Sequence, residues 1–304
     1  MKNQQVVVIL GPTAVGKTET SIQLAKKLNG EIINGDALQV YQDLTIGTAK
    51  ISESEMEGVP HHLLSILPPD ASFSVAEYQL LVRQKIEEIS ARGCVPILVG
   101  GTGLYIQSVL YDFRFETSPQ DVELRKRLEL QTNQQLWEQL NQLDSEAAKE
   151  IPYQNKQRII RALERVLTSG KTKLQQQQDV GTTPYYNFYI VGLNRDRTQL
   201  YDRINQRVNV MLKNGLVTEV KGLLHTVSKD AQSLKAIGYK EVVEAIEKNW
   251  SSEQLTETIQ QNTRRYAKRQ LTYFRNKLPV NWYDPQQDYQ KIEQDCCSFL
   301  KGND

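Results

Sequence analysis

The chain has 304 residues, enough for one large domain or two smaller ones, and its hydrophobic content of 39% and charged content of 24% are ordinary for a soluble globular protein. Its formal net charge is only +1, so overall basicity does not indicate a nucleic-acid partner, although a local basic patch can still bind one. With three cysteines, no Cys-x-x-Cys pair and three histidines, the composition argues against a structural zinc site or a disulfide framework.

The first hundred residues alternate short β-branched runs with helical periods, a pattern typical of a parallel α/β sheet. The apolar run Val6–Leu10 predicts a buried strand. Because this run is too short for a signal peptide or a membrane span, we expect a cytoplasmic protein that does not enter membranes. Further strands are predicted at 31–34 and 95–99, and helices at 17–28 and 76–91.

A glycine-rich loop lies between the first predicted strand and the first predicted helix, and it matches the phosphate-loop pattern G-x-x-x-x-G-K-[ST]. In such a loop, backbone N–H groups turn toward an oxyanion and the helix N-terminus adds partial positive charge. Lys17 would supply a mobile cation, and Thr18 can orient Mg²⁺. The motif predicts that a diphosphate or a triphosphate binds to Gly11, Pro12, Thr13, Ala14, Val15, Gly16, Lys17 and Thr18.

Two further polar residues follow the ends of predicted strands. Asp36 comes after the second strand and Thr102 after the third. Because ligands bind beyond the carboxyl ends of the strands in an open parallel sheet, we expect both to lie near the phosphate loop. Asp36 is a candidate general base or Mg²⁺ ligand, or simply the cap of the next turn. The third strand ends in two glycines instead of the aspartate of a Walker B strand, which argues against a nucleotide hydrolase.

The composition changes after about residue 113. The segment 120–180 is rich in Gln, Glu, Lys and Arg and contains no convincing strand, so we expect it to be mainly helical. A strand pattern resumes at 187–193, and long helices are predicted within 199–275. We therefore predict an α/β protein in which a P-loop NTPase-like parallel sheet, with helices on both faces, is interrupted by a mainly helical insertion. The predicted core is 1–114 with 185–304, the predicted insertion is 115–184, and we expect a monomer.

Two groups of basic residues are candidates for binding RNA. The segment 264–277 contains six basic residues and no acidic one, interleaved with aromatic residues. It is either an RNA-binding surface or a solvated helix face above core aromatics. Arg158, Arg161 and Arg165 share one helical face, where they could contact RNA or form ion pairs with Glu164 or other neighbours.

Eight sequence blocks follow one another along nearly the whole chain: GPTAVGKT at 11–18, GDALQVY at 35–41, IGTAK at 46–50, PHHL at 60–63, VGGTGLY at 99–105, QRIIRALE at 157–164, AIGYKE at 236–241 and NTRRYAKRQ at 262–270. In these blocks the chain resembles the bacterial-type tRNA dimethylallyltransferases, which are isopentenyltransferases that modify adenosine. The resemblance implies transfer of a dimethylallyl group from dimethylallyl diphosphate to N6 of the adenosine immediately 3′ of the anticodon, with Mg²⁺ as cofactor and the tRNA anticodon stem-loop as partner.

The resemblance also implies roles for individual residues. Asp36 matches the general base, Arg207 an arginine that holds the diphosphate, and Thr102 a residue at the reaction centre. Together with Thr18, these three are the predicted catalytic residues. The residues expected to contact tRNA are Asp36, Ala37, Leu38, Gln39, Thr102, Gln157, Arg158, Ile159, Ile160, Arg161, Arg264, Arg265, Lys268 and Arg269.

One position departs from the family, and two other activities share the phosphate loop. Family members commonly have Asp-Ser where this chain has Asp36-Ala37, so a hydroxyl that could position the substrate is missing beside the predicted base. An adenylate isopentenyltransferase, which makes a cytokinin from free AMP, ADP or ATP, would also use the loop and the aspartate. A P-loop kinase for a small metabolite is a more distant alternative. The helical insertion and the basic C-terminal helix favour tRNA as the acceptor.

Overall fold

The computed structural model describes residues 2–113, 115, 121–170, 172 and 180–302. The chain divides into two compact units, one formed by 1–110 and 184–304 and the other by 111–183. The insertion expected from the sequence began at 115 and ended at 184, and its stretches 116–120 and 173–179 lie outside the described residues.

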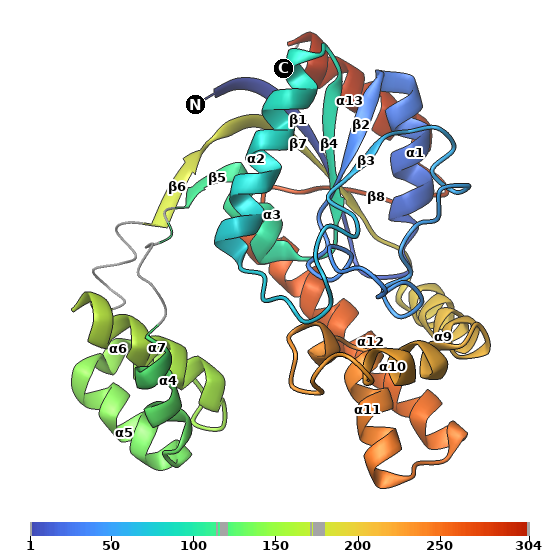
Figure 1. Cartoon of the computed structure of the whole chain (residues 1–304). Coiled ribbons are helices and arrows are strands. Elements are labelled where there is room, and N and C mark those ends of the chain that lie inside the picture. The colour runs from blue at the N-terminus through green and yellow to red at the C-terminus, as the bar shows by residue number, and fades with distance from the viewer. Residues whose placement is uncertain (1, 114, 116–120, 171, 173–179, 303–304) are drawn as a thin grey trace. The chain divides into compact units, whose positions relative to one another are not determined.

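The first unit is built on a parallel sheet, shown in Figure 1. β1 lies at its centre between β4 and β7, and all the pairings along the sheet are parallel. Val8 of β1 faces Leu98 on one side and Ile190 on the other. The order across the sheet is β3 (His61–His62), β2 (Gly30–Asn34), β4 (Val95–Gly100), β1 (Lys2–Leu10), β7 (Tyr186–Leu193) and β8 (Asn281–Tyr283).

Helices cover both faces of this sheet, as predicted. The inner strands β1, β2 and β4 are largely buried, and Val6–Leu10 of β1 has no exposed surface. On one face, α1 (Lys17–Leu28) and α13 (Tyr289–Lys301) share an apolar core with the strands. On the other face lie α2 (Val75–Ala91) and α3 (Gly103–Leu110), as Figure 1 shows. The continuous apolar runs of the central strands follow from this double coverage.

Further helices of the first unit lie beyond the carboxyl ends of the strands (Figure 1). Among them α12 is the longest and packs against α9, α11 and α3. The order along the chain is α9 (Arg197–Lys213), α10 (Leu216–Leu223), the short 3₁₀ helix η1 (Ser233–Lys235), α11 (Tyr239–Lys248) and α12 (Ser252–Lys277).

The second unit has a core of its own. Its helices are amphipathic and enclose apolar residues such as Leu136, Leu140, Ile159 and Leu163. Its strands β5 and β6 form a separate two-stranded sheet that the sequence analysis did not expect. The elements are β5 (Tyr111–Phe113), α4 (Val122–Glu129), α5 (Asn133–Leu143), α6 (Ser145–Glu150), α7 (Lys156–Ser169) and β6 (Val180–Pro184).

Within the described part of the chain, no helix has both the length and the apolar character needed to cross a bilayer.

Candidate functional site

A cavity of about 690 Å³ opens at the carboxyl ends of β1, β2 and β4 in the first unit. Its wall combines the phosphate loop, the turns that follow β2 and β4, and side chains from α9 and α12. The sequence-predicted residues that line it are Thr13, Ala14, Val15, Gly16, Lys17, Thr18, Asp36, Ala37, Leu38, Gln39, Thr102, Arg207 and Arg269.

The phosphate loop connects β1 to α1 and is held from outside by two arginines. Gly16, at the N-cap of α1, has a φ of 115°, which favours glycine. Arg203 Nε donates a hydrogen bond to the Ala14 carbonyl at 2.9 Å, and Arg195 Nε donates to the Val15 carbonyl at 2.8 Å. The loop is therefore fixed by cationic side chains that also add positive charge beside it.

Lys17 is the cation at the centre of the loop. Its Nζ donates to the carbonyl oxygens of Gly11 and Pro12, both at 3.0 Å. Burial lowers the pKa of Lys17 to about 8, and the nearby Arg207 guanidinium lowers it as well, whereas the Asp36 carboxylate opposes the shift. An anion bound beside Lys17 would stabilise its protonated form.

Arg207 reaches the same cavity from α9. Its Nη2 donates to the Thr48 carbonyl at 3.4 Å, but its buried Nε has no hydrogen-bond partner among the described residues. Burial lowers the pKa of Arg207, and the Asp36 carboxylate partly counteracts this effect. Because a buried donor without a partner costs free energy, an anionic ligand that accepts from Nε fits this position. A diphosphate oxygen would supply such an acceptor.

Asp36 uses its two carboxylate oxygens differently. Oδ1 accepts a hydrogen bond from the Leu38 N–H at 2.9 Å, so Asp36 does cap the turn after β2. No described residue donates a hydrogen bond to Oδ2. The backbone of Asp36 is itself fixed, because its N–H donates to Asn34 Oδ1 at 2.9 Å. Asp36 therefore caps the turn with Oδ1, and Oδ2 remains available to accept a proton.

Thr102 lies beside Asp36 and is connected to α12. Its Oγ1 accepts a hydrogen bond from the Ala37 N–H at 3.2 Å. Burial and the Asp36 charge raise the pKa of Tyr266, whereas the nearby Thr102 and Gln270 side chains lower it. Tyr266 therefore stays protonated at neutral pH. Tyr266 and Gln270 were not predicted as site residues, although their i, i+4 spacing in a matching block places both on one helix face.

The basic residues of α12 occupy different environments. Arg269 lines the cavity, with its guanidinium 5.7 Å from the centre of the Tyr266 ring. Arg264 donates from Nη1 to Asn205 Oδ1 at 2.6 Å, so it is held against α9. Arg265 and Lys268 are exposed and do not line the cavity. Only Arg269 of these four is thus placed beside the predicted reaction centre.

In the second unit, the predicted tRNA-contacting stretch lies on α7. Gln157, Arg158 and Arg161 are exposed, whereas Ile159 and Ile160 are buried in the apolar core of that unit. Direct side-chain contact of the two isoleucines with tRNA is therefore a wrong expectation, because enclosed side chains cannot touch RNA. Among the described residues, the ion pair of Glu164 is with Arg125 Nη1 at 3.2 Å, and not with Arg158 or Arg161.

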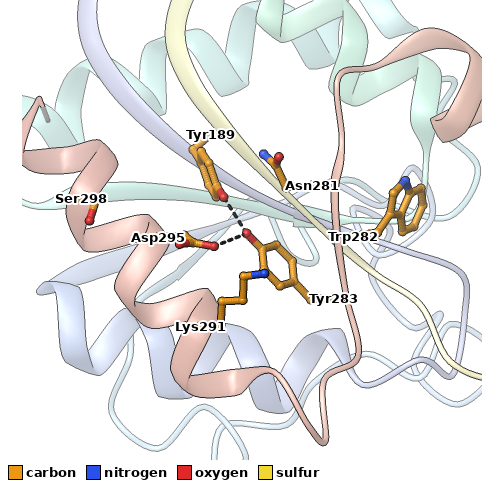
Figure 2. Close-up of a pocket in the computed structure, with 7 residues that line it drawn as sticks. All are labelled: Tyr189, Asn281, Trp282, Tyr283, Lys291, Asp295 and Ser298. Atoms are coloured by element: carbon orange, nitrogen blue, oxygen red, sulfur yellow. Dashed lines mark hydrogen bonds between the residues drawn. The ribbon is translucent and has the colours of Figure 1, made fainter. Parts of the chain in front are cut away.

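A second, more open hollow of about 410 Å³ lies between β7, β8 and α13 (Figure 2). The Tyr283 hydroxyl donates to Asp295 Oδ2 at 2.6 Å and lies 2.6 Å from the Tyr189 hydroxyl. Burial and the hydrogen bond with Asp295 raise the pKa of Tyr283. Figure 2 shows both neighbours pointing at the Tyr283 hydroxyl. These bonds anchor α13 to the sheet, so we interpret the hollow as structural.

Sequence comparison relates the chain to enzymes that act on tRNA. The family profile described as IPP transferase matches residues 39–277. The tRNA dimethylallyltransferase of Anoxybacillus flavithermus is 50% identical over 301 residues, covering 98% of this chain and 97% of the relative. The tRNA dimethylallyltransferase of Bacillus subtilis is 49% identical over 305 residues, with coverages of 98% and 97%.

Structural comparison leads to the same group. The tRNA delta(2)-isopentenylpyrophosphate transferase from Staphylococcus epidermidis matches with a TM-score of 0.73 and 44% identity, covering 99% of this chain and 100% of that one. A eukaryotic dimethylallyltransferase acting on tRNA matches with a TM-score of 0.84 and 27% identity, covering 99% and 80%.

Proposed function

The chain belongs to the IPP transferase family, and we propose that it transfers a dimethylallyl group from dimethylallyl diphosphate to N6 of the adenosine immediately 3′ of the anticodon in tRNA, releasing diphosphate. It is a prenyl transferase, and tRNA is its substrate. The single observation that carries the proposed chemistry is that Lys17, Arg207 and Asp36 line one cavity. That cavity therefore offers cations for a leaving diphosphate and a carboxylate for a proton.

The diphosphate half of the reaction is assigned to the phosphate loop and Arg207. As the bond between the allylic carbon and the diphosphate oxygen breaks, negative charge moves onto the diphosphate. Lys17 and Arg207 would stabilise this charge more in the transition state than in the substrate, which lowers the barrier. The buried Arg207 Nε, which has no described partner, supports this assignment.

Mg²⁺ fits the same end of the cavity. The Thr18 hydroxyl and the Asp36 carboxylate both line it, and hard oxygen donors together with substrate phosphates are the ligands that Mg²⁺ prefers. We propose that Thr18 holds the ion with the diphosphate. When bound, Mg²⁺ would supply further positive charge to the leaving group.

The acceptor half is assigned to Asp36 and Thr102. The exocyclic amine of adenine is a poor nucleophile because its lone pair is delocalised into the ring. As N6 forms its bond to the allylic carbon, Asp36 Oδ2 would accept the N6 proton, an effect worth roughly 10²–10⁴-fold in rate. Thr102, bonded to the Ala37 N–H, would hold the turn that carries Asp36 in place.

Binding of tRNA must offset the cost of removing the target adenosine from its stack, which is about a few kcal/mol. We propose that Asp36, Ala37, Leu38, Gln39 and Thr102 contact the extruded nucleotide. The exposed residues proposed to bind the rest of the tRNA are Gln157, Arg158, Arg161, Arg265, Lys268 and Arg269. We also propose that the protein acts as a cytoplasmic monomer.

The test is mass spectrometry of unmodified tRNA after incubation with the protein, Mg²⁺ and dimethylallyl diphosphate. We expect one dimethylallyl group at N6 of the adenosine 3′ of the anticodon. Parallel reactions offer free AMP as acceptor, or ATP with small metabolites as phosphoryl acceptors. Prenylation of AMP in preference to tRNA, or ATP-dependent phosphate transfer, would contradict the proposal.

A further inference from the structure

The side chain of Gln270 joins two segments that serve different halves of the proposed reaction. It projects from α12 and is 5% exposed. Its Oε1 accepts a hydrogen bond from the Thr13 N–H at 3.0 Å, and its Nε2 donates to the Gly101 carbonyl at 2.8 Å. Thr13 belongs to the phosphate loop, and Gly101 immediately precedes Thr102. One buried amide therefore ties the loop after β1 to the turn after β4.

The chemistry of both partners fixes the orientation of this amide. The Thr13 N–H can only donate and the Gly101 carbonyl can only accept, so a residue with one acceptor and one donor is required. A glutamate in its place would direct an oxygen at the Gly101 carbonyl, and an apolar side chain would leave both backbone groups without a partner. Each buried backbone group that loses its hydrogen bond lowers the stability of the folded protein by about 1–3 kcal/mol.

The backbone approaches Gln270 so closely that Gly101 has no room for a side chain. A Cβ at position 101 would lie 2.3 Å from Gln270 Nε2. The next obstacles are ordinary contacts, with Gln270 Cδ at 3.5 Å and the Gly11 carbonyl at 3.7 Å. Position 101 therefore requires glycine because the Gln270 amide occupies the space that a Cβ would need.

The same amide also reaches the acceptor side. Gly101, whose carbonyl accepts from Gln270 Nε2, is followed directly by Thr102, and Thr102 Oγ1 accepts a hydrogen bond from the Ala37 N–H beside Asp36. Gln270 therefore connects the diphosphate-binding loop with the turn that carries the proposed base.

We propose that Gln270 is the positioning residue that sets the distance between the bound diphosphate and the acceptor adenosine, an inference that rests on the proposed prenyl transfer. Reacting atoms must approach to about 3–3.5 Å, and a displacement of about 1 Å can cost roughly 100-fold in rate. Gln270 acts through Thr13 and Thr102, so its loss slows the chemical step without removing any of the cationic groups that bind diphosphate.

The first test replaces the amide while keeping its approximate volume. Gln270→Met is expected to lower kcat by about 100-fold, with the KM for tRNA nearly unchanged. Gln270→Glu is expected to be no better, because it restores the shape but not the donor. Gln261→Met is the matched control, since Gln261 lies exposed on the same helix. Rates are expressed per folded, diphosphate-binding molecule, so that a loss of folded protein alone does not change kcat.

The second test is a double-mutant cycle between positions 101 and 270. Gly101→Ala alone is expected to reduce kcat by about as much as Gln270→Ala, because the new methyl group displaces the glutamine. The double variant is expected to be no slower than the slower single variant, because the clash disappears with the side chain. Losses that multiply would show that the two positions act independently and would overturn the inference.

The activity of the wild-type protein distinguishes a failure of the proposed function from a failure of the positioning role of Gln270. If wild-type protein transfers no dimethylallyl group to tRNA, the proposed function fails. If wild-type protein is active and Gln270→Met has the same kcat, only the positioning role of Gln270 fails.

Discussion

Lys17 and Arg207 reach the same cavity from the phosphate loop and from α9, and the Arg207 guanidinium helps burial to lower the pKa of Lys17 to about 8. Two cations that line one cavity repel each other, and burial weakens the hydration of both. A bound diphosphate would relieve this repulsion. The pair is therefore arranged for an anionic ligand.

The first prediction concerns pH. Because the Lys17 ammonium loses its proton as pH rises through about 8, affinity for dimethylallyl diphosphate should fall above that pH, by at most about tenfold per pH unit for one proton. Calorimetric titration from pH 7.5 upward measures this, since a phosphate has by then lost its second proton. Lys17→Met should bind weakly and without this dependence. Constant wild-type affinity between pH 7.5 and 9.5 would contradict the prediction.

The second prediction separates the two oxygens of Asp36. Asp36→Asn keeps an oxygen that can accept from the Leu38 N–H but removes the base. We expect kcat to fall by about 10²–10⁴-fold with little change in the dissociation constant for tRNA, as measured by single-turnover kinetics and filter binding. Asp36→Ala should lose the same rate and also some thermal stability, because the cap is lost. Near-normal turnover of Asp36→Asn would rule out proton acceptance by Asp36.

The third prediction concerns Glu219 on α10. Its carboxylate accepts hydrogen bonds from the backbone N–H groups of Thr45, Ile46 and Gly47 at 2.8–3.2 Å and from the Tyr239 hydroxyl at 2.5 Å. Successive N–H groups of this kind form a nest for an anion, which the protein here fills with its own carboxylate.

The segment fixed by Glu219 continues to Thr48, whose carbonyl accepts from Arg207 Nη2. Glu219→Gln would place an amide donor against backbone donors, so we expect the KM for dimethylallyl diphosphate to rise by roughly tenfold, about the effect of losing 1.4 kcal/mol. Steady-state kinetics measures the change. Glu247→Gln, on the exposed surface of α11, is the control. An unchanged KM would show that the segment holds its position without Glu219.

The fourth prediction concerns tRNA binding by α7. Arg158 and Arg161 are both exposed, and each is expected to neutralise about one phosphate. The logarithm of the binding constant should then depend less steeply on the logarithm of salt concentration, by about 0.7–0.9 per arginine removed. Filter binding of Arg158→Ala and Arg161→Ala at several salt concentrations tests this, with Arg127→Ala as a surface control. Equal slopes for all variants would exclude phosphate contact.

The sequence predicted the central part of the sheet well. The structure confirms the strands that were predicted from apolar runs, which are β1, β2, β4 and β7. Such runs occur because helices cover these strands on both faces. β3 and β8 were not predicted. They contain two and three residues, and a segment that short has no measurable periodicity.

The candidate site was predictable where a local motif or the end of a parallel strand marks it, as for the phosphate loop and for Asp36 and Thr102. The phosphate loop is continuous in the sequence, so its spacing alone identified it. Gln270 was not identified, because it meets Thr13 across 257 positions of the chain and its segment reads as a basic helix. Ile159 and Ile160 were wrongly expected to touch tRNA, since a matching block includes core residues together with surface ones.

The Leu110 carbonyl accepts a hydrogen bond from the Tyr185 N–H at 2.8 Å, so the chain leaves the sheet-containing unit and returns to it at adjacent points. The second unit, which lies between these two points of the chain, has its own apolar core. We therefore expect that the second unit can be replaced by a short glycine-serine linker between Leu110 and Tyr185. Such a trimmed chain would keep every residue that lines the 690 Å³ cavity, because none of them belongs to the segment 111–183.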